Sequence, residues 1–130
     1  MPWDGSPNLG RESRGAVGYA QGLAAENQVE RAYLNRGARL LERRWRGRSG
    51  EIDLIFEQDD DVIMVEVKSS RTHSRAAEKV LPRQIARLMR AAEEFLGTLP
   101  RGLLTPMRLD VALVDGTGHI EILENALMDV

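Results

Sequence analysis

The residues best suited to chemistry lie in the stretch GEIDLIFEQDDDVIMVEVK, which runs from Gly50 to Lys68. It contains Asp53 and, beyond a run of three aspartates, Glu66 followed two positions later by Lys68. Two carboxylates supply the hard oxygen ligands that Mg²⁺ prefers. A nearby lysine can orient or help to deprotonate an attacking water and offset the charge of a phosphate. Metal ion, activated water and lysine together form an apparatus for phosphodiester hydrolysis.

The same residues also have a purely structural interpretation. An aspartate, twelve residues, and then Glu-x-Lys is a spacing that occurs often by chance. A solvated strand face that carries one salt bridge would have the same pattern. The spacing alone therefore leaves both interpretations open.

A hairpin is the element that must position these groups. Hydrophobic residues alternate with other residues on both sides of the acidic run, which predicts two strands. Because successive side chains of a strand point to opposite faces, the ionisable groups share one face. The other face is hydrophobic and carries Ile52, Leu54, Phe56, Ile63, Val65 and Val67.

The length of the turn fixes which residues lie opposite each other. If Asp59–Asp60 is a two-residue turn, Asp53 lies opposite Glu66. Like charges in this relation destabilise a sheet, so the pair predicts a divalent cation between the two carboxylates. In the same register Glu51 lies opposite Lys68, which is ordinary charge compensation that would hold the lysine in place. A change of one residue in the turn would break both pairings.

The rest of the chain predicts an α/β fold with a mixed central β-sheet of about five strands flanked by helices. Residues 1–13 are rich in Pro, Gly, Ser and Asn, which predicts a mobile arm, and residues 14–130 form a single domain. Hydrophobic spacing predicts helices over 14–36 and 82–96, a loop over 69–78, and strands over 107–114 and 120–123. Residues 38–46 are compatible with a strand or a helix.

Length and composition narrow the class of protein. A chain of 130 residues with 42% hydrophobic residues is large enough for one domain with its own core. It has no cysteine, which excludes disulfides and cysteine-based zinc sites. It shows neither a signal peptide nor the roughly 20 apolar residues of a membrane helix. We therefore expect a cytoplasmic protein with no membrane contact.

The formal net charge of -2 is not typical of a nucleic-acid-binding protein, but the charges are unevenly distributed. Residues 31–48 contain seven arginines and one acid, whereas residues 110–130 contain no Lys or Arg. These bases could contact phosphates or form a solvated basic face. The candidates for phosphate contact are Arg44, Arg46 and Arg48, together with Arg71 and Arg75 in the predicted loop.

Several segments together resemble the YraN family of bacterial proteins. They are GEIDLI and VEVK in the hairpin, Ala25–Glu26 through Gly37, Arg44–Trp45–Arg46, Pro82–Arg83–Gln84 and Arg108–Leu109–Asp110. The resemblance covers about residues 14 to 115, and it is more specific than the carboxylate spacing. The departures are modest: Ala25 replaces the more common Gly, Arg83 replaces Lys, and Leu109 replaces Phe.

The resemblance implies a restriction-endonuclease-like PD-(D/E)xK fold and a nuclease site. Asp53 and Glu66 would bind Mg²⁺ or Mn²⁺, and Lys68 would be the catalytic lysine. Glu26 would be an additional catalytic and metal-binding acid from the first helix, and Gln84 an accessory polar group. The implied substrate is DNA, including branched or otherwise structured DNA. A homodimer would suit such an activity, because an enzyme that cuts a junction needs two sites.

Other interpretations remain open at this point. By spacing alone Glu30 is as good a helix acid as Glu26, and only the resemblance favours Glu26. Asp110 could stand near the site, although we favour a structural role. Trp45 could stack on a base or pack in the core. The chain could also be a non-catalytic module that binds nucleic acid or a protein partner, or a purely structural α/β protein.

Overall fold

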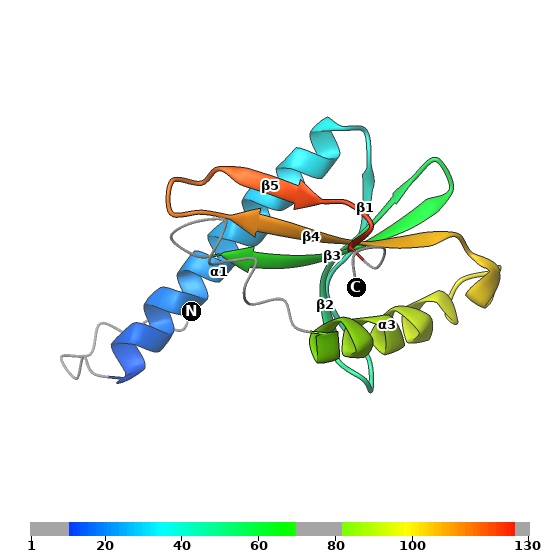
Figure 1. Cartoon of the computed structure of the whole chain (residues 1–130), viewed down its shortest axis with the longest axis horizontal. Coiled ribbons are helices and arrows are strands. Elements are labelled where there is room, and N and C mark those ends of the chain that lie inside the picture. The colour runs from blue at the N-terminus through cyan, green and yellow to red at the C-terminus, as the bar shows by residue number, and fades with distance from the viewer. Residues whose placement is uncertain (1–10, 70–81, 127–130) are drawn as a thin grey trace.

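The computed structural model describes residues 11–69 and 82–126, and within the first helix it describes side chains from residue 22 onward. In these ranges the chain forms a five-stranded sheet with a helix on each face (Figure 1). The elements are α1 (Arg11–Asn35), β1 (Arg39–Arg46), β2 (Glu51–Gln58), β3 (Asp61–Ser69), α3 (Pro82–Leu96), η1 (Gly102–Leu104), β4 (Met107–Val114) and β5 (Ile120–Leu123). The predicted α/β fold with a mixed sheet is confirmed.

The strands follow one another across the sheet in chain order, from β1 at one edge to β5 at the other. Neighbours are antiparallel except β3 and β4, which are parallel. A parallel pair needs a crossover connection, and the segment that contains α3 supplies it. The segment over 38–46, left open between strand and helix, is a strand. Most of the predicted arm over 1–13 lies outside the described residues, and its last three residues belong to α1.

The hairpin of β2 and β3 has the predicted turn and register. Asp59 and Asp60 both have positive φ angles, 53° and 71°, as a type I′ turn requires at its two central residues. Pairing runs from Gln58 opposite Asp61 back to Leu54 opposite Val65. The two-residue turn is therefore confirmed, although aspartate adopts this backbone less readily than Asn or Gly.

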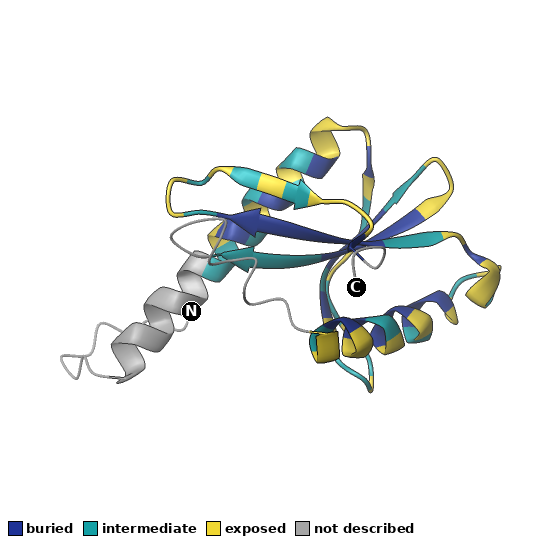
Figure 2. Ribbon diagram, in the orientation of Figure 1, coloured by how far each residue is buried: buried dark blue, intermediate teal, exposed yellow. Residues whose placement is uncertain are grey.

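Each helix covers its own face of the sheet with a separate hydrophobic cluster (Figure 2). Ala25, Val29 and Tyr33 of α1 pack on one face. The strand residues of that cluster are Leu54, Phe56, Ile63, Val65, Ala112 and Val114. The apolar stripe of α3 packs on the other face with Ile52, Ile55, Val62, Met64 and Leu109. The central strands β2, β3 and β4 are thus buried on both sides over most of their length, which fixes the positions of their side chains.

Ile52 corrects one part of the sequence prediction. Strict alternation placed it on the same face as Leu54, but it packs with Ile55 in the α3 cluster. It lies opposite Trp45 of β1, whose ring meets Phe95 edge-on at 5.4 Å between centroids. The ladder to β3 ends at Leu54, so the start of β2 is paired to β1 alone. The residue of β1 before Trp45, Arg44, has a φ angle of 50°, so the backbone is irregular at the point where the face changes.

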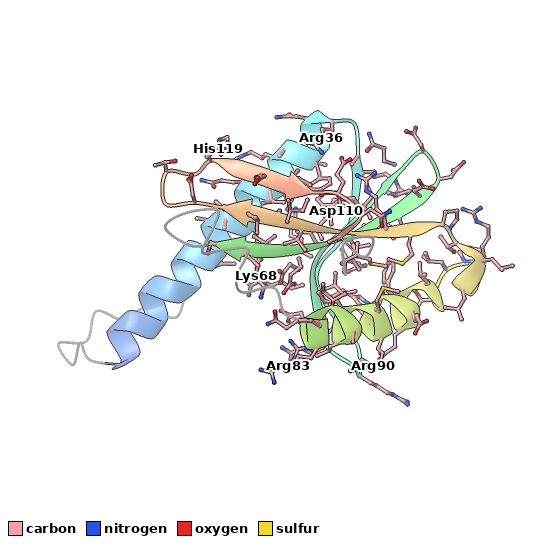
Figure 3. All side chains as sticks on the ribbon, in the orientation of Figure 1. Arg36, Lys68, Arg83, Arg90, Asp110 and His119 are labelled. Atoms are coloured by element: carbon pink, nitrogen blue, oxygen red, sulfur yellow. The ribbon has the colours of Figure 1, made fainter. Side chains whose placement is uncertain are left out.

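A buried polar network ties α1 to the far half of the sheet. Asp110 of β4 is fully buried (Figure 3). Its carboxylate accepts hydrogen bonds from the Tyr33 hydroxyl at 2.6 Å, the Arg108 Nε at 3.0 Å and the Asn125 backbone N–H at 2.9 Å. Tyr33 also stacks on Phe56, with ring centroids 4.6 Å apart. These contacts fit the structural role that we favoured for Asp110.

Among the described residues, no helix is both long and apolar enough to span a membrane.

Replacing Tyr33 with Phe tests this network. The substitution keeps the stacking on Phe56 but removes one donor from a buried carboxylate. Because hydrogen bonds to charged groups contribute about 1.5–3 kcal/mol, we expect the free energy of unfolding to fall by about 2 kcal/mol, as measured by urea denaturation. Thr117→Ala, which removes an exposed hydroxyl donor, should change it by less than about 0.5 kcal/mol. Equal stabilities for the Tyr33 variant and the wild type would contradict the structural role.

Candidate functional site

Asp53 and Glu66 meet where the β2–β3 ladder stops. The last regular pair is Leu54 with Val65. One position further, the Asp53 Oδ2 accepts the backbone N–H of Val67 at 2.8 Å, so a side chain takes the place of a ladder hydrogen bond. The Asp53 side chain also shares a hydrogen bond with Glu66. The structure therefore brings the two predicted carboxylates together.

This arrangement changes the titration of Asp53. Burial, followed by the charge and hydrogen bond of Glu66, raises the pKa of Asp53 to about 8. The Val67 N–H works in the opposite direction, because it stabilises the ionised form. At neutral pH and without a cation, Asp53 thus largely keeps its proton.

Lys68 contacts Glu66 and not the residue predicted for it. Its Nζ lies 3.2 Å from the Glu66 Oε2, and the two side chains are only 18% and 16% exposed. The predicted pair of Glu51 with Lys68 is wrong: Glu51 forms its ion pair with Arg46 of β1, at 3.2 Å. The reason is the same early end of the ladder, since β2 at Glu51 is paired with β1.

The geometry distinguishes the two helix acids that spacing left equivalent. Glu26 accepts two hydrogen bonds from Arg44, at 2.9 and 3.4 Å, and is 16% exposed. Burial raises the pKa of Glu26, and the charge of Asp53 adds to the effect. Glu30 instead pairs with the exposed Arg43, at 2.7 and 2.8 Å, and this contact lowers its pKa. Glu26 is therefore the acid that interacts with the site.

The backbone of β1 is irregular beside Glu26. Arg44 has a φ angle of 50°, which is uncommon for a residue other than Gly, Asn or Asp. It lies between the regular pairs Arg43–Leu54 and Trp45–Ile52, at the position that faces Asp53. This predicted phosphate contact is thus directed to a carboxylate of the site.

The number of carboxylates at the site decides which metal ion it could hold. Within residues 11–69 and 82–126, no three carboxylate or imidazole groups are arranged to hold one ion together. Asp53 and Glu66 remain as an adjacent pair. Mg²⁺ is commonly held by one or two carboxylates and keeps several of its waters. The pair therefore fits Mg²⁺, with Glu26 nearby as a third acid.

An open pocket of about 530 Å³ gives access to this pair. Asp53, Glu66 and Glu51 form its acidic part. Arg46 at the end of β1 and Arg48 in the β1–β2 loop over 47–50 form a basic wall. Arg87 and Leu88 of α3 complete the lining. A ligand with negative charge can thus enter between the carboxylates and arginines.

Glu94 holds the loop wall in place. Its carboxylate accepts the backbone N–H groups of Arg48 and Ser49 at 2.6 and 2.8 Å and the Ser49 hydroxyl at 2.6 Å. These bonds, first that of the hydroxyl, lower the pKa of Glu94. Sequence reasoning missed this residue. No local sequence pattern indicates it, because its partners are two backbone N–H groups and one hydroxyl that lie 45 and 46 positions away.

The remaining predicted residues differ in position. Gln84 lies in the first turn of α3, three positions before the pocket residue Arg87. Trp45 packs against Phe95, which favours the packing role. Arg71 and Arg75 lie outside the described residues.

The chain is similar to known proteins over most of its length. Residues 25–114 match an uncharacterised protein family, UPF0102. A UPF0102 protein of Ruegeria pomeroyi is 60% identical over 114 residues, which cover 88% of this chain and 93% of the relative. One of Cereibacter sphaeroides is 51% identical, covering 86% and 96%, and one of Roseobacter denitrificans is 46% identical, covering 92% of each.

Gly47→Ala tests the packing of the loop wall. A methyl group there would lie 2.3 Å from the Glu94 Oε2 and 2.7 Å from the Trp45 ring, and Glu94 cannot move without breaking its loop bonds. We expect a loss of about 1–3 kcal/mol in the free energy of unfolding. Gly22→Ala in α1, which meets nothing within 4 Å, should instead gain about 0.5–1 kcal/mol. A harmless Gly47→Ala would show that the loop is not clamped.

Asp53→Asn tests the raised pKa of Asp53. In the metal-free wild type the folded state keeps a proton that the unfolded chain releases near pH 4, so this group lowers stability as the pH rises from about 4 to about 8. Asparagine does not titrate. In EDTA we expect the Tm of the variant to exceed that of the wild type by a margin that grows with pH and levels off above about pH 8. A constant margin from pH 5 to 8 would contradict the assignment.

Proposed function

The chain belongs to the protein family UPF0102, the YraN family. From this family membership and from the proximity of the Asp53 and Glu66 carboxyl groups, we propose that it is a metal-dependent nuclease. The proposed reaction is hydrolysis of phosphodiester bonds in DNA, including branched or otherwise structured DNA. The observation that carries the proposal is the proximity of Asp53 and Glu66, two carboxyl groups that both line an open pocket.

A divalent cation explains why such a pair would be retained. Two adjacent, half-buried carboxyl groups oppose folding when both are ionised, and a cation between them removes the repulsion. Asp53 and Glu66 would hold Mg²⁺ or Mn²⁺, and Glu26, held by Arg44, would add negative charge beside them. The bound ion would supply Lewis acidity toward a phosphate oxygen and a more acidic water.

The other residues of the pocket have roles that suit a phosphate substrate. Lys68 is held by Glu66, and its ammonium group would orient the attacking water and offset the charge that develops on the phosphate. Arg46 and Arg48 are positioned at the pocket wall for contacts with phosphate oxygens. Gln84 would serve as an accessory polar group. The predicted phosphate contacts of Arg71 and Arg75 stay part of the proposal.

Cleavage assays test the proposed activity. We expect cleavage in Mg²⁺ or Mn²⁺ of at least one of a panel of single-stranded, duplex, flap and four-way-junction DNAs. Glu66→Ala and Lys68→Ala should each reduce the rate at least about 100-fold, the scale of a lost acid–base or charge-stabilising group. Glu57→Gln, which changes a carboxylate of β2 that pairs with Arg39, should cut as the wild type does.

Two results would contradict the proposal. Cleavage that survives both site substitutions would identify a contaminant. Salt-dependent DNA binding by the wild type, with no cleavage under any condition, would favour the alternative of a non-catalytic module. A calorimetric titration with Mn²⁺ is an independent test. Asp53→Asn should weaken metal binding at least about tenfold, the scale of the loss of a metal ligand or of its hydrogen-bond partner.

A further inference from the structure

The solvent face of α3 carries a row of arginines that the proposed site does not use. Arg83, Arg87 and Arg90 are all exposed, and their spacing of four and three residues places them on one side of the helix. Figure 3 shows Arg83 and Arg90 along the edge of α3 that faces away from the sheet. Arg87, the middle member of the row, also lines the pocket, so the row passes beside the candidate site.

These arginines differ from those on the opposite side of the molecule. Arg36, Arg39 and Arg43 each form an ion pair with a glutamate. Within residues 11–69 and 82–126, no ion pair joins Arg83, Arg87 or Arg90 to a carboxylate. Their charges therefore remain available to a ligand.

Glu94 explains part of this difference. It stands four positions after Arg90, the spacing at which a glutamate and an arginine pair on a helix. Its carboxylate is instead occupied by Arg48 and Ser49 of the β1–β2 loop. The clamp thus withdraws one of the two glutamates that stand at pairing distance after Arg90, the other being Glu93, and fixes the loop that bears Arg48 to the same helix. Figure 1 shows this loop passing α3 toward the face that carries the row.

The row is unfavourable for the helix itself. Like charges three and four residues apart destabilise a helix, and the row contains two such pairs. Seven residues of helix extend about 10 Å. One strand of a duplex presents a phosphate about every 3.4 Å of axis, so this length corresponds to about three phosphates. A polyanionic strand would relieve the repulsion and match the row.

We propose that Arg83, Arg87 and Arg90 form a track for the phosphate backbone of the nucleic acid whose scissile bond enters the pocket. This inference rests on the proposed function and assigns the helix face along which the substrate passes the site. Contacts of this kind position a nucleic acid and do not specify its sequence. The track should therefore act on binding and leave the chemical step unchanged.

The salt dependence of binding tests the track. The test variant is Arg83→Gln/Arg90→Gln, which keeps the pocket residue Arg87. The control is Arg36→Gln/Arg39→Gln, which removes the same charge from paired arginines. Binding of a labelled duplex, in EDTA to prevent cleavage, is followed by anisotropy at several salt concentrations. The slope of log K against log salt should fall in magnitude by about 1.8 for the test variant and stay at the wild-type value for the control.

Two further readouts exclude trivial explanations. The Tm of the test variant should equal or exceed that of the wild type, because repulsion is removed. Its cleavage at saturating protein should match the wild-type rate, with only the half-saturating concentration raised. A wild-type slope for the test variant, or an equal loss in the control, would overturn the track and leave the nuclease proposal standing. A wild type that neither binds nor cuts DNA would overturn both.

Discussion

The approach of Asp53 to Glu66 is the interaction on which the rest of the structure depends, because two carboxyl groups held together away from water oppose folding. The ladder between β2 and β3 ends at this point, and the freed N–H of Val67 is donated to the Asp53 carboxylate. The ammonium group of Lys68 lies against Glu66. Each neighbour compensates one carboxyl group in part, yet the raised pKa of Asp53 shows that the compensation is incomplete. Such residual destabilisation is characteristic of sites that are kept for binding or chemistry.

The sheet cannot build this site alone, and each helix adds a different part. α1 packs on one face of the sheet and places Glu26 near Asp53. There Arg44, at an irregular position within β1, holds the Glu26 carboxylate. α3 packs on the opposite face and closes the pocket with Arg87, while Glu94 fixes the β1–β2 loop. The two hydrophobic clusters thus set the distance between Glu26 of α1 and Arg87 of α3, although these helices pack on opposite faces of the sheet. A loss of packing on either face would be transmitted to the pocket as a displacement of one wall.

The sequence was sufficient for features governed by local rules and insufficient for those governed by distant partners. The turn at Asp59–Asp60 and the meeting of Asp53 with Glu66 follow from alternation and loop length alone. The face of Ile52 and the partner of Glu51 could not be derived, because both depend on where the β2–β3 ladder stops. No sequence pattern predicts that Glu94 binds the β1–β2 loop, because two of its three hydrogen-bond donors are main-chain groups. Alternation predicts faces only while the backbone stays regular, and it is irregular where Arg44 of β1 faces Asp53 of β2.

Net charge is a poor guide to the partners of this protein, for a reason that the ion pairs make plain. The formal charge of -2 sums arginines that are already neutralised, such as Arg36 and Arg39, with arginines that are not. What a polyanion meets at close range is the local field, because charges beyond about 8–10 Å are screened at physiological salt. The arginines paired with glutamates extend over α1 and β1, whereas the row on α3 adjoins the pocket. An acidic protein can therefore present a basic surface beside an acidic pocket, while arginines elsewhere on its surface are paired with glutamates.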